Sequence, residues 1–389
     1  MKQEIPIEQT AVERQIKRPN IGVMANVRVK DGAFLGKQGP ALLKYLQMAS
    51  DLKTSMCVFS PADVDISKSV LYGYVLTPGD TDGSYRLRRV LQQIPLVIYD
   101  QVLSRRYERI PNVADTLHFL RRKAVIFNDG YFDKWEVQSW LQSNPLLRKH
   151  LPHTAFLMNA KTLERFVSLY EVVFVKPIHG SLGIGISKIT RVPDGFEVVT
   201  RLKVGSSPVA KYATAGQLYA AFKKNWRSKA RVIQEGIDLL HYEGRPLDLR
   251  AIVQKDGSGT WKRTKVFGRV AGVGEFTSNL TTGGEAMSLS ALANDMPNLP
   301  WSDIRLQIQK LISVIPTVIE EGSGKLLGEM GIDLGMDISG HVHIIEVNAK
   351  PWKTAATENG SAKLVDLSFM RPIRFALQLA RSFDAGGER

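Results

Sequence analysis

Residues 329–348 read EMGIDLGMDISGHVHIIEVN, two apolar runs separated by a short polar turn. The dipeptide Ser339-Gly340 is typical of the centre of a β-hairpin turn. A hairpin centred there places Asp333 directly opposite Glu346 on the neighbouring strand. Directly opposed residues share one face of a sheet, with Cβ atoms about 4.5–5.5 Å apart. The sequence therefore predicts two carboxylates held side by side within apolar strands.

Two carboxylates at that separation repel, and each raises the pKa of the other unless a cation lies between them. Asn348 follows Glu346 by two residues, so it shares the same face and adds an oxygen without adding charge. Asp333, Glu346 and Asn348 form a candidate site for Mg²⁺ or Mn²⁺, completed by phosphate oxygens and water. A solvated hairpin face is the alternative, which the apolar neighbours of both acids disfavour. His341 and His343 have the opposite parity on this strand, so we expect both to face away from the site.

A second hairpin lies earlier in the chain. Its strands, Val172–Lys176 and Ile186–Ile189, are joined by HGSLGIG at residues 179–185, a loop with three glycines. Glycine has no Cβ and adopts positive φ readily, so backbone N–H groups of such a loop can approach phosphate oxygens closely. Lys176 stands just before the loop on a strand of Val and Phe, where a lysine without an anionic partner is unfavourable. A phosphate is the natural partner and a salt bridge the alternative, so the candidate nucleotide contacts are Lys176, His179, Gly180, Ser181, Gly183 and Gly185.

The segment IQEGID at residues 233–238 ends a further strand with carboxylates. Such a segment suits a hinge that offers backbone groups to adenine and a carboxylate to ribose. A simple acidic turn would have the same pattern, so both interpretations stand.

The next strand carries Asp248 and Arg250 two residues apart, on one face. Asp248 could therefore orient the Arg250 guanidinium toward a phosphate. Arg269 follows, and then a polar, Gly-ended loop from Ser278 to Gly284 that contains Asn279. This loop could close over a transferred phosphoryl group or be an exposed connection.

Alternating strand and helix patterns predict a mixed α/β (α+β) chain of several lobes, since 389 residues exceed the size of one usual core. The N-terminal part begins with a strand from Ile21, a Gly-rich turn at Asp31–Gly39 and a helix opened by Pro40. Open α/β sheets bind anions at such loops, so residues 36–39 are candidates for substrate contact, with a plain connection as the alternative. The expected divisions are a polar tail (1–18), an α/β N-terminal domain (19–126), a central lobe with the Gly-rich loop (127–205), a C-terminal lobe with the metal site (206–383) and a tail (384–389).

The composition argues against several classes of protein. Apolar runs stay far below the ~18 residues of a membrane-spanning helix, and residues 1–18 offer no apolar stretch for a secretion signal, so we expect a cytoplasmic protein. Cys57 is the only cysteine, which excludes an internal disulfide and fits a buried strand. The formal charge of +14 favours anionic partners such as nucleotides or acidic substrates. No base-reading module accompanies this charge, so nucleic acid is the less favoured partner.

These elements, in this order, resemble the ATP-grasp superfamily from about Asn128 to the last helix. Residues 252–257 (IVQKDG), 279–284 (NLTTGG) and 345–348 (IEVN) are similar to the YheC/YheD-type branch, which is associated with the endospore coat of Gram-positive spore formers. The resemblance implies an ATP-grasp fold with an α/β pre-ATP-grasp N-terminal domain. It also implies ATP and Mg²⁺ as cofactors, and spore-coat association as an alternative location.

The resemblance further implies a role for each matching position. The phosphates are assigned to Lys134 and Lys176, adenine to Gln234, Glu235 and Ile237, ribose to Asp238 or Glu243, magnesium to Asp333, Glu346 and Asn348, and the phosphate-side arginine to Arg250.

The implied reaction joins a small-molecule or peptide carboxylate to an amine through an acyl phosphate. Such a transfer needs no side-chain nucleophile, because positioning and charge neutralisation carry it. Arg250, Arg269 and Asn279 are the candidate catalytic residues. The alternatives are a nucleotide-binding coat protein without turnover and a kinase that phosphorylates a hydroxyl.

Overall fold

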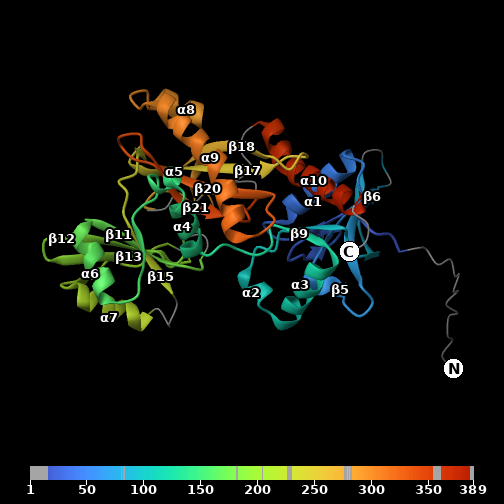
Figure 1. Cartoon of the computed structure of the whole chain (residues 1–389), viewed down its shortest axis with the longest axis horizontal. Helices are drawn as coiled ribbons and strands as arrows, with labels where there is room; N and C mark the ends of the chain where they lie inside the picture. Colours follow the sequence, from blue (N-terminus) through green and yellow to red (C-terminus); the bar gives the residue numbers. More distant parts are fainter. Residues whose placement is uncertain are drawn as a thin grey trace.

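The computed structural model describes residues 16–79, 81, 84–180, 183–203, 205–225, 230–275, 278, 280, 283–353 and 361–385. Within these residues the strands form three large sheets and one two-stranded ribbon, and each large sheet organises one lobe (Figure 1). The predicted mixed α/β class is confirmed. No helix in the described part of the chain is both long and apolar enough to cross a membrane.

The first lobe is an open sheet with helices on both faces. Its elements are β1 (Ile21–Met24), the ribbon β2 (Val29–Lys30) and β3 (Ala33–Phe34), α1 (Gly39–Asp51), β4 (Met56–Phe59), the 3-10 turn η1 (Pro61–Asp63), β5 (Val64–Asp65), β6 (Val70–Pro78), β7 (Tyr85–Gln93), β8 (Val97–Asp100), α2 (Arg105–Glu108), α3 (Pro111–Lys123) and β9 (Val125–Phe127). The strand order is β5-β6-β4-β1-β8-β9, with β7 paired to β6 and with β4, β1, β8 and β9 parallel. Helix α3 covers one face, where Cys57 is fully buried as predicted.

The other face of the first sheet is covered by α1 and by the last helix of the chain, α10 (Ala362–Ala385), which lie side by side in Figure 1. Tyr45 and Phe369 meet edge to face with ring centroids 5.0 Å apart. The same helix contacts the third lobe, because Gln254 donates to the Ser368 carbonyl at 2.7 Å and Arg371 donates to the Thr264 hydroxyl at 2.7 Å. Helix α10 therefore joins the two lobes.

The second lobe is an antiparallel sheet with helices on one face. Its elements are β10 (Thr154–Phe156), α6 (Ala160–Leu169), β11 (Val172–Pro177), β12 (Ser187–Val192), β13 (Gly195–Thr200), β14 (Ala210–Tyr212), α7 (Ala215–Asn225) and β15 (Arg231–Glu235), in the strand order β10-β15-β11-β12-β13-β14. Val173 and Val175 of β11 pack beneath α6 and α7. Side chains alternate along a strand, so Phe174 and Lys176 project from the opposite face, away from α6 and α7.

The third lobe is a sheet backed by one long helix. Its elements are α4 (Lys134–Ser143), α5 (Pro145–Arg148), β16 (His241–Tyr242), β17 (Arg245–Lys255), β18 (Trp261–Val270), β19 (Glu285–Ser288), α8 (Leu289–Asp295), α9 (Trp301–Ser323), β20 (Glu329–Met336) and β21 (Val342–Asn348). The strand order is β19-β18-β17-β20-β21, with β16 paired to β17. Residues such as Ile308 and Leu311 of α9 share a buried core with Ile332 of β20. In Figure 1 this lobe lies between the other two.

The two strands that flank the glycine loop lie close to the bounds read from the sequence: β11 extends one residue beyond Lys176, and β12 runs from Ser187 to Val192 instead of from Ile186 to Ile189. The lobe divisions differ. Strand β15 pairs with β11 across more than fifty residues, so the second lobe continues to Glu235 rather than ending at residue 205. Helices α4 and α5 pack against α9 and belong with the third lobe, and α10 extends to Ala385, beyond the division expected at residue 383. The N-terminal tail lies mostly outside the described residues.

Candidate functional site

Three charged side chains lie in one row across adjacent strands of the third sheet. Arg250 of β17 pairs with Asp333 of β20, which pairs in turn with Glu346 of β21. Residues of β20 such as Ile332 and Leu334 face the core beneath α9, so Asp333 points away from that helix. The predicted pairing of Asp333 with Glu346 is confirmed.

The turn and the strand register of this hairpin differ from the predicted ones. Asp337 N–H donates to the His341 carbonyl at 3.1 Å, and Gly340 N–H donates to the Asp337 carbonyl at 3.0 Å, so the turn is centred on Ser339. A β-bulge at Ile345 then restores the register, with Leu334 opposite Ile344 on one side and Asp333 opposite Glu346 on the other. The one-residue shift in the turn and the extra residue cancel.

The bulge changes the facing of His343, so its predicted orientation is wrong. His343 pairs with Gly335 and therefore lies on the face of Asp333 and Glu346, not behind it. Its Nε2 lies 2.8 Å from Asp337 Oδ2, which engages the ring near the turn. His341 stands in the turn and stacks on His150 with ring centroids 4.7 Å apart. Neither imidazole contacts the two acids in the described interactions.

Asp333 is compensated by two arginines. Arg250 donates to it with two nitrogens, Nε and Nη2, the latter at 2.9 Å, and Arg269 Nη2 lies 3.2 Å from its Oδ1. Burial alone would raise the pKa of Asp333, but Arg250 and Arg269 outweigh it and hold the pKa below its ordinary value. The carboxylate is therefore ionised at neutral pH and is paired with both guanidinium groups.

Asp248 orients a different arginine from the one predicted. Its two oxygens accept from Arg269 Nε at 2.7 Å and Nη2 at 2.6 Å, while Arg250 is held by Asp333. Arg269 is opposite Asp248 on β18, which explains the choice. Burial and the nearby Asp333 raise the pKa of Asp248, against the effect of Arg269. The two arginines and two acids form one buried charge cluster.

Glu346 is compensated by Lys134, the first residue of α4, through an ion pair between Nζ and Oε1. Asp133 caps this helix, accepting from Trp135 N–H at 2.7 Å and Glu136 N–H at 3.3 Å. The cap fixes the first turn of α4, and with it the place of Lys134 over the hairpin.

Lys176 approaches the same acids from the second lobe. Burial lowers its pKa to about 8, and the neighbouring Lys134 adds to this while Glu346 opposes it. Lys176 Nζ donates to Gln234 Oε1, a neutral oxygen, rather than to a carboxylate as in the alternative considered. Two lysines from different lobes thus converge near Glu346, an arrangement that suits a polyphosphate.

The glycine loop joins the two strands as predicted. Gly183 and Gly185 have φ of 71° and 80°, a region that other residues adopt at a cost. His179 Nδ1 lies 3.3 Å from Asp133 Oδ2 and 3.3 Å from Arg105 Nη1, so the loop start is tied to α4 and to the first lobe. Gly180 lies in the described part of the loop, whereas Ser181, like Asn279 of the later loop, lies outside the described residues.

The hinge segment after β15 uses most of its polar side chains internally. Gln234 donates to the Thr154 hydroxyl at 2.9 Å, and Glu235 Oε1 accepts from His153 N–H at 2.8 Å. Ile237 accepts from Leu239 N–H at 2.9 Å. Asp238 is exposed, whereas Glu243 lies 3.2 Å from Arg245. Asp238 is therefore the freer of the two acids considered for ribose.

The donor set fits a hard divalent ion. Asn348 lies opposite Gly331, on the face of Asp333 and Glu346. In the described part of the chain no three His, Cys, Asp or Glu side chains group closely enough to hold a metal alone. Two carboxylates and one carboxamide leave positions for phosphate oxygens and water, as Mg²⁺ or Mn²⁺ requires. In this structure Arg250, Arg269 and Lys134 supply the positive charge that compensates the two acids.

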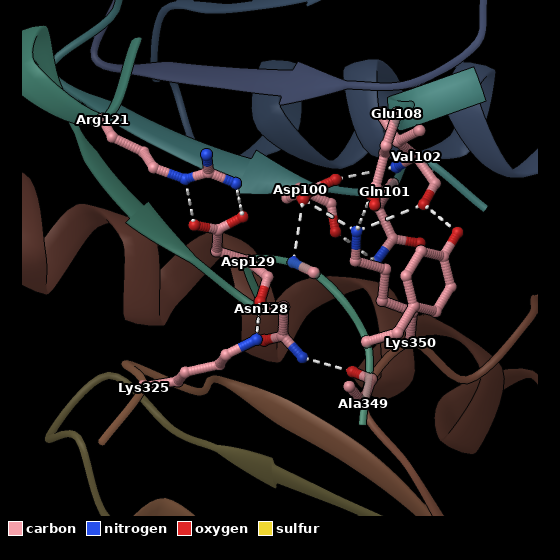
Figure 2. Close-up of polar contacts among 12 residues, drawn as sticks. Asp100, Gln101, Val102, Glu108, Arg121, Asn128, Asp129, Lys325, Ala349 and Lys350 are labelled. Carbon is pink, nitrogen blue, oxygen red and sulfur yellow. Dashed lines mark hydrogen bonds and ion pairs between the residues drawn. The ribbon is translucent and has the colours of Figure 1, made fainter. Parts of the chain in front are cut away.

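Sequence reasoning missed a clamp between the first and third lobes, drawn in Figure 2. Lys350, two residues after Asn348, lies 2.7 Å from Asp100 and 3.2 Å from Glu108, and its side chain is 1% exposed. Asn128 donates to the Glu329 carbonyl at 2.7 Å and accepts from Gly328 N–H at 2.8 Å. These contacts hold the end of the β20–β21 hairpin against β8. The signal available in the sequence was a lysine two residues after the IEVN segment.

Comparison with known proteins agrees with this architecture. Residues 123–379 match the YheC/D like ATP-grasp family. Endospore coat-associated protein YheD of Bacillus subtilis is 27% identical over 292 residues, which are 74% of this chain and 63% of that protein. The chain thus spans less than two-thirds of that relative.

Two solved structures have a similar fold over nearly their whole length. D-alanyl-alanine synthetase A from Vibrio cholerae O1 gives a TM-score of 0.54 at 12% identity, covering 96% of this chain and 100% of that one. VanG D-Ala:D-Ser ligase from Enterococcus faecalis gives 0.52 at 12% identity, covering 94% and 99%. The fold they share is typical of ATP-dependent ligases. With the family match covering both hairpins and the hinge between them, the chain belongs to the YheC/D like ATP-grasp family and has the ATP-grasp fold.

Proposed function

We propose that the protein is an ATP-dependent carboxylate–amine ligase that works through an acyl phosphate. One observation carries the proposal: Asp333 and Glu346 lie paired on one hairpin, with Lys134 and Lys176 converging on them from two elements. Opposed acids with facing lysines suit a metal-bound polyphosphate better than a structural ion-pair network, because Lys176 has a neutral oxygen for a partner.

The residues divide the binding of the nucleotide between the lobes. Lys134, Lys176 and the loop residues His179, Gly180, Gly183 and Gly185 would contact phosphates, while the backbone at Glu235 and Ile237 would face adenine and Asp238 the ribose. Asp333, Glu346 and Asn348 would hold Mg²⁺, with Mn²⁺ as the substitute. The bound metal supplies charge neutralisation and alignment of the phosphate oxygens. Binding of a cation at Asp333 would free Arg250 from its carboxylate for the transferring phosphoryl group.

The proposed reaction balances without a protein nucleophile. A carboxylate oxygen of the substrate attacks the γ-phosphorus, the bond from that phosphorus to the bridging oxygen breaks, and ADP leaves. The amine then attacks the acyl carbon, its proton passes to solvent, and phosphate leaves as the carbon–oxygen bond breaks. Arg250 and Arg269 stabilise the charge on the transferring group, and Asn279 is proposed to assist.

The substrate acid would enter from the first lobe. Gln38, at the start of α1, donates to the Gln101 carbonyl at 2.9 Å, so the 36–39 loop lies beside the end of β8. The acid and the amine, small molecules or a peptide, would meet between this edge and the metal hairpin. The Lys350 clamp keeps the two in register.

Phosphate release from Mg-ATP in the presence of pooled amino acids and peptides tests the proposal. Glu346→Gln should abolish release, because it removes a metal ligand at nearly constant volume. Glu321→Gln, an exposed acid on α9, is the matched control and should retain release. Activity that survives in Glu346→Gln would contradict the site assignment.

Two alternatives give different products. A kinase acting on a hydroxyl would form no hydroxamate when hydroxylamine is added, whereas an acyl phosphate would. A coat component that binds nucleotide without turnover would bind Mg-ADP but release no phosphate with any substrate pool; the relative YheD is named as endospore coat-associated.

A further inference from the structure

A buried arginine outside the predicted site lies at the exit of the glycine loop. Arg201 directly follows β13 and is 2% exposed, the largest of the fully buried side chains described. Its backbone closes the loop, because Arg201 N–H donates to the Ile186 carbonyl at 2.8 Å and its carbonyl accepts from Gly185 N–H at 2.8 Å. The guanidinium is therefore anchored where the loop ends.

Arg201 has one anionic contact, and it comes from the other lobe. Its Nη1 forms an ion pair with Glu275 Oε2, five residues after the end of β18. Its Nε is buried and has no hydrogen-bond partner among the described residues. Arg250 and Arg269, by contrast, each hold a carboxylate with two nitrogens. A guanidinium carries five donors, and a buried donor left unused is unfavourable, so Arg201 has capacity for a further acceptor.

A chain of contacts leads from this pair to the metal face. Ser278, three residues after Glu275, hydrogen-bonds Asp248, which holds Arg269, which in turn contacts Asp333. The partner of Arg201 therefore stands on the same segment after β18 as Ser278, which contacts the buried charge cluster.

A second arginine adds to the positive potential at the loop exit. Arg231, at the start of β15, donates to the Gly185 carbonyl at 3.0 Å. Burial lowers its pKa to about 10, which leaves it cationic at neutral pH. The Arg231 guanidinium and the Arg201 backbone thus both hold Gly185, the last glycine of the loop.

We propose that Arg201 binds the terminal phosphate of the nucleotide, and that Glu275 is the internal anion that occupies Arg201 while no nucleotide is bound. This inference rests on the proposed function and deepens it by adding a catalytic contact from the second lobe. A γ-phosphate offers more charge and more acceptor oxygens than one carboxylate, so it satisfies the donor that Glu275 leaves unused. Glu275 then acts as a competitor for Arg201.

The competitor arrangement makes opposite predictions for the two partners. Isothermal titration calorimetry with Mg-ADP and with the non-hydrolysable analogue Mg-AMP-PNP compares the wild type with Arg201→Gln, Glu275→Gln and the double variant. Arg201→Gln should weaken AMP-PNP at least tenfold, about 1.4 kcal/mol, and change ADP less than twofold. Glu275→Gln should strengthen AMP-PNP severalfold, and the double variant should match Arg201→Gln.

A simple latch between lobes would give another result. If Arg201 and Glu275 only hold the lobes together, both single variants should weaken ADP and AMP-PNP alike, and that outcome would overturn the inference. A gain of affinity in Glu275→Gln cannot come from misfolding, so this arm stays decisive even if Arg201→Gln folds poorly. A wild-type protein that binds neither nucleotide would instead refute the proposed function itself.

Discussion

The surroundings of Lys176 give nucleotide binding a definite pH dependence. Burial and the neighbouring Lys134 lower the pKa of Lys176 to about 8, against the opposing effect of Glu346. At that value the protonated fraction falls from about nine-tenths at pH 7 to about one-tenth at pH 9. A triphosphate binds the protonated form, so its association constant should fall about tenfold over this range, roughly 1.4 kcal/mol.

The direction of proton transfer on binding depends on the protonation state of Lys176 in the free protein and in the complex. Phosphate raises the pKa of a bound lysine, so the complex should take up a proton as it forms above pH 8. At pH 8.5 about three-quarters of the free protein would carry a neutral Lys176, and uptake should approach that fraction of a proton. Calorimetry of Mg-AMP-PNP binding in two buffers of different ionisation enthalpy measures this number directly.

A charge-preserving variant supplies the control. Lys176→Arg keeps a cation that does not titrate near neutrality, so its affinity should stay flat between pH 7 and pH 9. Equal affinity at both pH values in the wild type, without proton uptake, would refute the assignment of Lys176 to the phosphates. An equal slope in Lys176→Arg would place the titrating group elsewhere.

Three further perturbations follow from the described contacts. Lys176→Met should stabilise the nucleotide-free protein by about 1–2 kcal/mol in urea denaturation while abolishing AMP-PNP binding, because a charge with a lowered pKa destabilises the fold at neutral pH. Lys350→Met leaves Asp100 buried without its cation and should lower the free energy of unfolding by about 3–5 kcal/mol, and an unchanged urea midpoint would show that the clamp is dispensable. Burial raises the pKa of Asp337, but hydrogen bonds from Ser339 and His343 outweigh it and lower the pKa to about 2. The stabilisation of the fold by ionised Asp337 should therefore persist above about pH 4 and be lost as pH falls toward 2. Asp337→Asn should flatten that part of the acid unfolding curve.

The hairpin of β20 and β21 shows what residue patterns predict well. The opposition of Asp333 and Glu346 could be read from two apolar strands and a turn signal. The bulge could not, because Ile344 and Ile345 are both apolar and fit either face of the strand. His343 was misplaced for that reason alone, since a single extra residue reverses the parity of everything on one side of it.

Partners distant in sequence were harder to predict. Nothing local distinguishes Arg250 from Arg269 as the partner of Asp248, and the choice depends on which residue stands opposite it on β18. The end of the second lobe differs from the expected residue 205 for the same reason, because only the pairing with β11 shows that β15 belongs to this lobe. The hairpin of β6 and β7 was not predicted, because β7 is rich in exposed charged and polar side chains and lacks the apolar run of a buried strand.

Helix α10 packs its apolar residues against the first sheet and donates or accepts hydrogen bonds along β17 and β18. The final stretch of the polypeptide therefore braces the first and third lobes against each other, whereas the second lobe is connected to them by the backbone near His153 and Ile237 and by a few side-chain contacts, such as those of His179 and Arg201. Movement that admits nucleotide should accordingly be a swing of that lobe alone, and shortening the protein before Ala362 should uncouple acid selection from phosphate chemistry.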